Sequence, residues 1–354
     1  MQQKLKGRGA TGNPAGRFAR YVGQSVDDGW YQESVPDSIA TQVRAEAARS
    51  IISRNDSPDI PFGQSINPYR GCEHGCVYCY ARPAHAYVDL SPGIDFETKL
   101  FYKAGAAGLL RTELGRSGYR PEPIMLGANT DPYQPIEKRL RVTREILEVL
   151  LETRHPVTII TKGTLVLRDL DLLREFAALK LVTVTVSLTT LDAELKRTLE
   201  PRAAAPQARL RVIAALAEAG VPVGVLAAPM IPAVNDAELE QIIKAAAAAG
   251  ASRAGYVLLR LPHEVKELFR AWLELHLPLR AAHVMSLVQQ ARGGRDNDPQ
   301  FGSRMRGTGP WADLLRARYA LVVKRLGLNP DRNPALDTTQ FRPPRGAGQL
   351  EFAL

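Results

Sequence analysis

Cysteine is scarce in this sequence, with three residues in a chain of 354. All three lie within residues 72–79, an odd and clustered set that does not form the disulfide framework of a secreted protein. Long apolar runs are also lacking, since no stretch of about 18 apolar residues predicts a membrane-spanning helix. The N-terminus is polar and basic, without the apolar segment of a signal peptide. We therefore expect a cytoplasmic protein with no membrane partner.

The three thiols have the spacing C-x3-C-x2-C, at Cys72, Cys76 and Cys79, in a stretch rich in glycine. Thiolates this close together can share one centre, and soft sulfur ligands select Zn, Cu(I) or an iron-sulfur cluster. A structural zinc site needs a fourth ligand, for which His74 and His85 are nearest. A 4Fe-4S cluster with three protein ligands leaves one iron open for a substrate or cofactor. Three unrelated thiols are the remaining interpretation, and the spacing favours the cluster.

Beyond the cysteines, short β-branched runs alternate with longer segments of period 3.6. This alternation predicts an α/β fold in which parallel strands are joined by right-handed crossovers. Six such units make a partial (β/α)6 barrel, whose site lies at the carboxyl ends of the strands. The expected strands are one that ends near residues 66–69, then 123–127, 157–161, 181–187, 221–228 and 254–260. The expected helices are 97–116, 134–153, 168–179, 206–219 and 236–249.

The rest of the chain flanks this core. A helix is expected over residues 38–53, and a helical segment that ends with 311–326 is expected after the last strand. A glycine-arginine loop at 292–298 either covers the barrel mouth, contacts phosphates or is a solvated loop. The expected segments are an irregular N-terminal extension (1–60), the core (61–262), a helical segment (263–328) and a flexible proline-rich tail (329–354).

The net charge of +9 is concentrated in two regions. Residues 1–20 hold five basic residues and no acid, and residues 280–345 hold 12 basic against 5 acidic residues. Basic regions around a nearly neutral core are typical of a protein with a polyanionic partner, of which nucleic acid is the commonest. The alternative is that these charges only keep the termini soluble.

Three motifs carry a resemblance to a known family. The C-x3-C-x2-C spacing with an aromatic residue, Tyr78, before the last cysteine resembles the signature of radical S-adenosylmethionine (radical SAM) enzymes. The residues Cys-Val-Tyr-Cys-Tyr at 76–80, Asn-Thr-Asp-Pro-Tyr-Gln-Pro at 129–135 and Glu-Pro-Arg at 200–202 resemble the spore photoproduct lyase-like branch, also called DNA repair photolyase-like. Asn-Asp-Ser-Pro-Asp-Ile-Pro-Phe at 55–62 is similar to an uncharacterised bacterial subgroup of that branch.

This resemblance implies a fold, two cofactors and a reaction. The fold is the partial (β/α)6 TIM-type barrel, with an N-terminal extension and a C-terminal helical segment here. Cys72, Cys76 and Cys79 would hold a 4Fe-4S cluster whose fourth iron chelates the amino and carboxylate groups of SAM. Electron transfer from an external donor such as flavodoxin or ferredoxin would then cleave SAM to a 5′-deoxyadenosyl radical. Tyr78 matches the family's aromatic residue beside the adenine.

Further SAM contacts follow from the same resemblance. Asn129, Thr130 and Asp131 stand where the superfamily has a short motif for the SAM amine, although the glutamate of that motif is missing here. Lys162 and Ser187 resemble the branch's contacts to the SAM carboxylate and ribose. A solvated strand end for Lys162 and a turn residue for Ser187 are the structural alternatives.

One expected residue is absent. Spore photoproduct lyase uses a cysteine far from the cluster as hydrogen donor, together with a tyrosine directly after the last cluster cysteine. Tyr80 matches that tyrosine, but the chain has no fourth cysteine. The resemblance therefore predicts the radical and not the known hydrogen relay, and the missing thiol also excludes an auxiliary cluster.

The substrate is left open by these motifs. We expect a hydrogen-abstracting enzyme that acts on nucleic acid, with a small molecule or a polypeptide as the alternative substrate. From another class of protein, a metal-stabilised nucleic-acid-binding protein without turnover is the second alternative. The final residues 349–352, Gln-Leu-Glu-Phe, resemble the peptide with which bacterial repair proteins bind the replication clamp.

Overall fold

The computed structural model describes residues 6–19, 38–330 and 336–344. Its centre is a seven-stranded sheet in the order β10-β9-β8-β7-β6-β3-β2, in which every neighbouring pair is parallel except β2 and β3. The strands are β2 (Ile52–Arg54), β3 (Gln64–Ile66), β6 (Ile124–Leu126), β7 (Val157–Thr161), β8 (Val182–Ser187), β9 (Val223–Met230) and β10 (Arg253–Leu258). The six expected parallel strands and the partial-barrel fold are confirmed.

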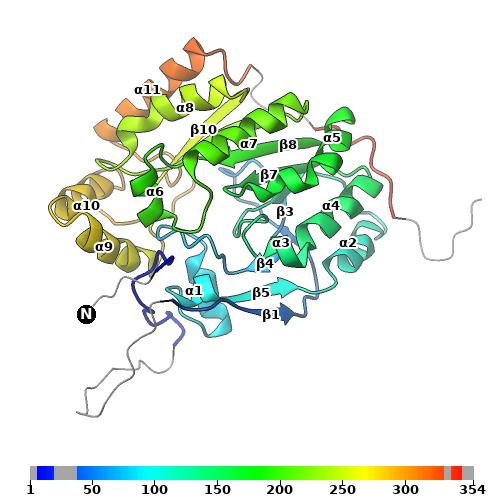
Figure 1. The fold of residues 1–354 in the computed structure, drawn as a ribbon, viewed down its shortest axis with the longest axis horizontal. Coiled ribbons are helices and arrows are strands. Elements are labelled where there is room, and N and C mark those ends of the chain that lie inside the picture. Colours follow the sequence, from blue (N-terminus) through cyan, green and yellow to red (C-terminus); the bar gives the residue numbers. More distant parts are fainter. Residues whose placement is uncertain (1–5, 20–37, 331–335, 345–354) are drawn as a thin grey trace, which may run out of the picture.

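Helices cover the outer face of this sheet (Figure 1). The helix α2 packs against α4 and α4 against α5, while α7 packs against α8 and α8 against α11. Their apolar faces bury residues such as Ile146, Leu147 and Leu150 against the strands, which is where most of the stabilising apolar burial lies. The bounds are α2 (Ala106–Leu114), α4 (Val142–Glu152), α5 (Leu170–Ala178), α7 (Pro206–Glu218), α8 (Leu239–Ala248) and α11 (Pro310–Arg325).

Short elements fill the connections of the core. The α6 helix (Ala193–Leu199) begins at Asp192, whose side chain accepts hydrogen bonds from two backbone N–H groups of the first turn. The others are α1 (Asp95–Thr98), α3 (Glu137–Leu140) and the 3-10 helices η1 (Arg82–Val88), η2 (Leu165–Asp169) and η3 (Asp236–Glu238).

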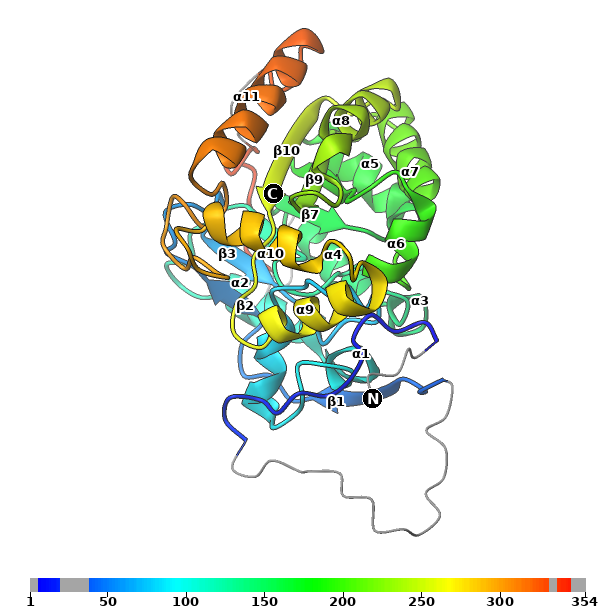
Figure 2. The ribbon, with the colours of Figure 1, turned by 90° about the vertical axis from the view of Figure 1, so that its left-hand side faces the viewer.

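Two further helices lie at the carboxyl end of the sheet. The helices α9 (Val265–His276) and α10 (Ala281–Gln290) pack side by side there (Figure 2). The apolar cluster that includes Phe269 and Trp272 of α9 also contains Val77 and Tyr78 of the cysteine stretch. The indole N–H of Trp272 donates to the carbonyl of Thr198 at 3.1 Å. The expected helical segment after the last strand is thus present, and it covers the end of the barrel where the site was expected.

The expected helix over residues 38–53 is wrong. This region forms β1 (Gln42–Glu46) and β2 instead. The first pairs in parallel with β5 (Lys99–Lys103), which in turn pairs with β4 (Tyr69–Arg70) in a separate three-stranded sheet. Backbone pairing with strands far along the chain outweighed the local preference of alanine for helix.

Two expected helices are shorter than predicted. The interval 97–116 contains the strand β5 before α2 begins, and its Leu, Phe and Tyr residues are typical of a strand. The interval 134–153 is divided into α3 and α4 at Arg141, which has a φ of +57° and so interrupts the helical backbone. The other three expected helices of the core are confirmed as α5, α7 and α8.

The prediction of a flexible tail is wrong for residues 336–344. The ring of Phe341 packs against those of Tyr119 and His155, with centroids 5.5 and 5.4 Å apart. The N–H of Arg342 donates to the carbonyl of Thr153 at 2.9 Å. An aromatic anchor thus holds this part of the tail on the core. The domain boundaries themselves remain a prediction, and no described helix is long and apolar enough to cross a membrane.

Candidate functional site

The cysteine loop, residues 71–80, follows β4 and lies between the sheet, α6 and α9. The side-chain amide of Gln134 fixes its start, because Oε1 accepts from the N–H of Glu73 at 2.8 Å and Nε2 donates to the carbonyl of Gly71 at 3.2 Å. Further along, the N–H of Val77 donates to the carbonyl of Leu199 at 3.0 Å. The loop therefore has a defined backbone conformation at the mouth of the barrel.

A buried ion pair supports the loop from the other side. The guanidinium of Arg82 lies 2.5 Å from the carboxylate of Glu97, and both side chains are fully buried. The Nε of Arg82 also donates to the carbonyl of Cys76 at 2.9 Å. The carboxylate of Glu97 accepts hydrogen bonds from the backbone N–H groups of Gly9 and Ala10 at 3.0 and 2.9 Å. A charged pair with this many partners satisfies the polar groups that burial removes from water.

The N-terminal segment therefore packs directly against the cysteine loop. A Cβ added to Gly9 would lie 1.9 Å from the carbonyl oxygen of Gly75, so only glycine fits there. The buried guanidinium of Arg8 donates to the carbonyl of Glu97 at 3.0 Å. Residues 8–10 were expected to belong to an irregular basic extension, and they are part of the support of the loop.

The thiols of Cys72, Cys76 and Cys79 lie within electrostatic range of one another. Burial raises the pKa of all three, and that of Cys76 rises to about 12 because Glu200 is also near. A bound metal ion deprotonates such thiols and repays the cost of burying their charge. In the described residues, no three Cys, His, Asp or Glu side chains are arranged as a metal site as they stand. The donor set nevertheless fits an iron-sulfur cluster, since three soft sulfur ligands share one supported loop.

Tyr78 joins this loop to a buried charged network at the ends of β7 and β8. Its hydroxyl donates to the carboxylate of Glu200 and lies 3.1 Å from the hydroxyl of Thr189. The same carboxylate pairs with Arg209, and it lies 3.1 Å from the ammonium of Lys162. Glu200 and Arg209 are fully buried. We call Tyr78, Lys162, Thr189, Glu200 and Arg209 the Glu200 network.

The network brings together two residues that were expected to bind SAM. The ammonium of Lys162 lies 2.6 Å from the hydroxyl of Ser187 and 3.4 Å from the carbonyl of Ala228. Lys162 is therefore not a solvated strand end, because its ammonium contacts groups of the two neighbouring strands, β8 and β9. Ser187 likewise faces the mouth of the barrel and does not serve as a turn residue.

Glu200 is the one carboxylate of the network and faces two cations, Arg209 and Lys162. Burial on its own raises the pKa of Glu200, but the neighbouring Arg209 and Lys162 outweigh that effect and hold the pKa well below its usual range. Glu200 is therefore a carboxylate at neutral pH. Glu200, the first residue of the Glu-Pro-Arg motif, thus has the geometry of an ion pair that orders its loop.

In the motif after β6, residues 129–131, the side chains of Thr130 and Asp131 make hydrogen bonds within the protein. Both carboxylate oxygens of Asp131 accept hydrogen bonds, from the hydroxyl of Thr161 and the N–H of Lys162, each at 2.7 Å. Its Oδ2 also lies 3.3 Å from Nδ1 of His74. The hydroxyl of Thr130 donates to the carbonyl of Tyr69 at 2.8 Å, whereas Asn129 is exposed. Asp131 thus ties the cysteine loop to β7, and a SAM contact of these three residues remains a prediction.

Tyr80 lies at the open side of the site. Tyr80 as a residue is 45% exposed, and its hydroxyl donates to the carbonyl of Ala128, just after β6. The guanidinium carbon of Arg260 lies 5.4 Å from the ring centroid. Partial burial, and then the neighbouring Cys79, raise the pKa of Tyr80 to about 12, so the phenol is neutral at pH 7. A role of Tyr80 in hydrogen transfer remains a prediction.

Sequence reasoning missed several residues that shape the site. Arg209 lies in phase with the apolar residues Val212, Ile213 and Leu216 on the inner face of α7, and a charge on such a face is the signal that reveals a buried partner. Arg82 and Glu97 gave no comparable signal, because they lie in a short 3-10 helix and a single turn of helix. The contact of Gly9 with the loop is not visible in the sequence at all.

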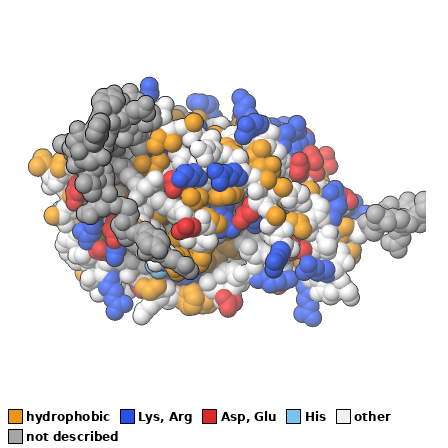
Figure 3. Space-filling view, turned by 90° about the horizontal axis from the view of Figure 1, so that it is seen from below, with side chains coloured by type: hydrophobic (Ala, Val, Ile, Leu, Met, Phe, Trp, Pro, Cys, Tyr) orange, Lys and Arg blue, Asp and Glu red, His pale blue; other side chains and the backbone are white. Residues whose placement is uncertain are grey.

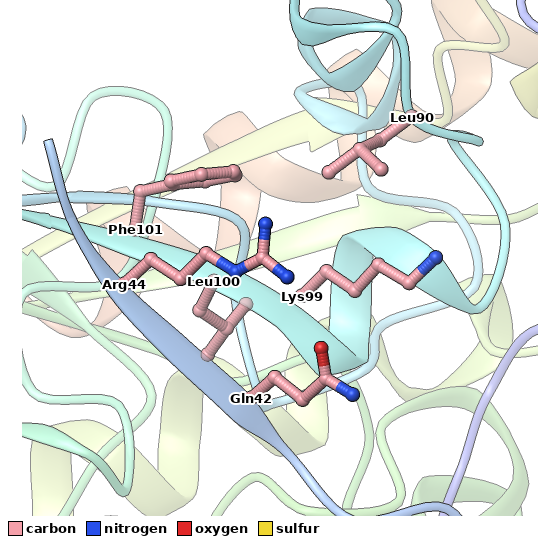
Figure 4. A pocket seen from close by; sticks show the side chains of 6 residues that line it. All are labelled: Gln42, Arg44, Leu90, Lys99, Leu100 and Phe101. Atoms are coloured by element: carbon pink, nitrogen blue, oxygen red, sulfur yellow. The ribbon is translucent and has the colours of Figure 1, made fainter.

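Two surface features lie apart from the thiols. A cavity of about 200 Å³ on the β1–β5 sheet is lined by Gln42, Arg44, Leu90, Lys99, Leu100 and Phe101, with no cysteine among them (Figure 4).

On the face shown in Figure 3, Lys and Arg side chains are scattered among hydrophobic and uncharged ones. Part of the basic charge of the flanks is internal, since Arg8 and Arg292 are buried.

The family of the chain follows from comparison with known proteins. The family model described as the radical SAM superfamily matches residues 66–246, which include the cysteine loop and the strands β6 to β9. The chain therefore belongs to the radical SAM superfamily. It is an enzyme of that superfamily, and membership implies a 4Fe-4S cluster and SAM as cofactors.

The relatives by sequence have no established function. An uncharacterised protein of Mycobacterium tuberculosis is 38% identical over 283 residues, which cover 79% of each chain. An uncharacterised protein of Mycobacterium bovis matches to the same extent. One of Methanocaldococcus jannaschii is 29% identical over 173 residues, 49% of this chain and 62% of that protein.

Solved structures of spore photoproduct lyase share the fold. A variant of that lyase with bound AdoMet and dinucleoside spore photoproduct superposes with a TM-score of 0.58 at 14% identity, over 82% of this chain and 80% of the other. A second variant gives a TM-score of 0.57 at 15% identity with the same coverage. The expected resemblance is confirmed at the level of fold. Membership in an enzyme superfamily favours catalysis over the alternative of a binding protein without turnover.

Proposed function

We propose that Cys72, Cys76 and Cys79 hold the 4Fe-4S cluster, and that Lys162 and Ser187 bind SAM beside it. The observation that carries this proposal is the Glu200 network, in which Tyr78 of the cysteine loop meets Lys162 at the ends of the parallel strands. When bound, the reduced cluster and SAM supply a 5′-deoxyadenosyl radical for hydrogen abstraction. The zinc alternative has less support, because His74 faces Asp131, and Nε2 of His85 lies 2.9 Å from the carbonyl of Lys99.

The residues of the chain have distinct tasks in this proposal. Lys162 presents a positive charge at the mouth, where a carboxylate group of SAM can accept from it. Glu200 fixes the position of Lys162, and the hydroxyl of Tyr78 holds its ring against the same carboxylate. Helix α9 covers this region with apolar side chains and so keeps water from the radical.

We further propose that the substrate is a nucleic acid. The net charge of +9, concentrated in residues 1–20 and 280–345, supports a polyanionic partner. With three cysteines in all, the chain has no thiol left to donate hydrogen once the cluster is bound. The exposed phenol of Tyr80 is then the side chain best placed to face a substrate at the mouth.

The first experiment measures iron, labile sulfide and the formation of 5′-deoxyadenosine from SAM under dithionite, on anaerobically purified protein. We expect a 4Fe-4S cluster and 5′-deoxyadenosine in the wild type, and neither in Cys76→Ala. The variant Arg316→Ala, which removes an exposed ion pair with Asp313, is the control and should behave as the wild type. One zinc per chain with no labile sulfide would contradict the proposal.

The second experiment addresses the substrate. Deuterated DNA and RNA are incubated with the reduced enzyme and SAM, and the deuterium in 5′-deoxyadenosine is measured by mass spectrometry. Transfer from either polymer supports the nucleic-acid substrate. Transfer from a labelled peptide or metabolite pool, with none from DNA or RNA, would instead establish the alternative substrate class. The clamp-binding peptide at 349–352 lies outside the described residues, and a clamp as partner remains a prediction.

A further inference from the structure

Arg260 occupies a distinctive position at the mouth of the barrel. It lies two residues beyond the end of β10, on the edge of the sheet where the cysteine loop and Lys162 also lie. Its guanidinium is stacked over the ring of Tyr80, with 5.4 Å between the guanidinium carbon and the ring centroid. Tyr80 directly follows Cys79 in the chain. Arg260 therefore contacts the residue next to one of the proposed cluster ligands.

No carboxylate of the described residues pairs with Arg260. Within the described ranges its one hydrogen bond to another side chain is weak, from NH1 to the sulfur of Met305 at 3.8 Å. Its Nε is buried and finds no hydrogen-bond partner among the residues that the structure describes. A partly buried guanidinium whose acceptors are this weak loses hydration that the described residues replace only in part. An anion from outside would be a strong acceptor for such a group.

Among the described residues, the neighbouring Arg304, unlike Arg260, is paired with a carboxylate. Arg304 makes a bidentate pair with Asp59, with Nε 2.8 Å and NH2 2.6 Å from the two carboxylate oxygens. Asp59 is the carboxylate near Arg260, and Arg304 already neutralises it. Burial, and then the charge of Arg304, lower the pKa of Arg260, which still stays charged at neutral pH. The charge of Arg260 is thus left without a counterion.

The surrounding chain places Arg260 at the open side of the barrel. The edge strands β10 and β2 do not pair with each other, so the sheet is open between them. The loop between α10 and α11 bridges this opening. The N–H of Leu258 at the end of β10 donates to the carbonyl of Met305 at 3.0 Å, and the N–H of Gly302 donates to Asp59 in the β2–β3 connection at 3.2 Å. Figure 2 shows this orange loop beside the blue ribbon of β2 and β3.

We propose that Arg260 binds an oxyanion group of the substrate, a phosphate or phosphodiester, beside Tyr80. The planar fork of a guanidinium matches two phosphate oxygens, and the ring of Tyr80 holds that fork in place from one face. The proposal rests on the proposed function only in taking the mouth of the barrel as the place where the substrate binds. It gives Arg260 the role of a specificity-determining residue that selects phosphorylated over uncharged substrates.

Binding of two probes to anaerobically purified full-length protein tests the proposal. The probes are a fluorescent single-stranded DNA oligonucleotide, followed by anisotropy over a range of salt concentrations, and inorganic pyrophosphate as its competitor. We expect Arg260→Gln to bind the oligonucleotide about tenfold more weakly, with a salt slope smaller by about 0.7. Arg260→Lys keeps the charge and should restore most of the slope. Arg111→Gln, which removes one exposed charge that pairs with Glu152, is the control for net charge.

A chemical measurement on the wild type needs no variant to fold. Phenylglyoxal modifies accessible arginines, and the modified positions are read by peptide mass spectrometry. We expect pyrophosphate to slow the modification of Arg260 several-fold and to leave Arg111 unchanged.

The outcomes separate this proposal from the nucleic-acid substrate. If the wild type binds pyrophosphate at Arg260 but no oligonucleotide, the anion site stands and the nucleic-acid substrate fails. If the oligonucleotide binds equally well to the wild type and to Arg260→Gln, with equal salt slopes, the role of Arg260 is refuted and the nucleic-acid substrate stands. Absence of any protection by pyrophosphate, together with no oligonucleotide binding, overturns both.

Discussion

Two charged regions meet at the mouth of this barrel, and they differ in how their charges are balanced. In the Glu200 network one carboxylate is surrounded by Arg209, Lys162 and the hydroxyls of Tyr78 and Thr189. At the open side, Arg260 faces the ring of Tyr80, and no carboxylate of the part of the chain that the structure describes pairs with it. The difference indicates that the closed region holds the cysteine loop in place, whereas the open region is left to bind a charged group from outside.

The largest effect should come from breaking the closed region with Glu200→Ala. This change leaves the guanidinium of Arg209 buried without a counterion, and we expect a loss of about 3–5 kcal/mol of unfolding free energy. Urea unfolding of the anaerobically purified protein measures it. The control is Glu240→Ala, whose carboxylate pairs with Arg318 at a half-exposed site and should cost about 1 kcal/mol or less. Equal losses in the two variants would show that the network is not a buried support.

Acid should destabilise the folded chain through a buried histidine outside both regions. His85 packs against Phe96 and Phe101, and its Nδ1 has no hydrogen-bond partner among the described residues. Burial lowers its pKa from 6.5 to about 4. The unfolded chain therefore binds a proton more readily than the folded chain, so the contribution of His85 is complete above pH 6.5 and is lost as the pH falls towards 4.

The size of this acid effect follows from the two pKa values. At about pH 5 the loss should be roughly 2 kcal/mol relative to neutral pH. Urea unfolding at the two pH values measures it, and His85→Gln should show a smaller difference between them, whatever its stability at neutral pH. If the variant and the wild type lose the same stability on acidification, other groups are responsible.

The smallest effect should come from removing a carboxylate from the open region. Asp59→Asn removes the carboxylate that pairs with Arg304, so that in the described residues neither Arg304 nor Arg260 has a carboxylate partner. We expect a loss of about 1 kcal/mol of stability, and oligonucleotide binding a few-fold tighter than in the wild type. Asp171→Asn removes an exposed carboxylate that pairs with Arg144 and controls for net charge. Weaker binding in Asp59→Asn would mean that the bridge between the edge strands, and not the free charge, favours the substrate.

The strand pattern and the motif made much of the fold predictable. Runs such as Val-Thr-Ile-Ile-Thr at 157–161 alternate with helices of similar length, and this order admits few arrangements other than a parallel sheet. The helix predicted over residues 38–53 was wrong because the strands that form there leave no such local pattern. The strands β1 and β2 exist because β5 and β3 pair with them, and a pairing between distant segments leaves no periodic signal in its own short stretch.

The candidate site was predictable only in part. The spacing of the cysteines identified the loop, and the positions of Lys162 and Ser187 after consecutive strands placed them at one edge of the sheet. That Lys162 and Ser187 lie within 2.6 Å of each other confirms their placement at the same edge. The sequence contained no comparable sign that Glu97 binds the backbone of Gly9 and Ala10, because those residues are 88 and 87 positions apart from it.

The sequence by itself determined the chemistry that this protein has available. Three thiols in one short stretch, and none elsewhere, leave one place for a soft metal centre and no thiol for a hydrogen relay. Only the tertiary structure decided which charged side chains are paired with an opposite charge and which are not. The pairing of Glu200 with Arg209, and the lack of a carboxylate partner for Arg260 among the described residues, depend on how distant segments meet at the mouth of the barrel. Burial then makes a paired charge a support and leaves an unpaired one in need of an anion.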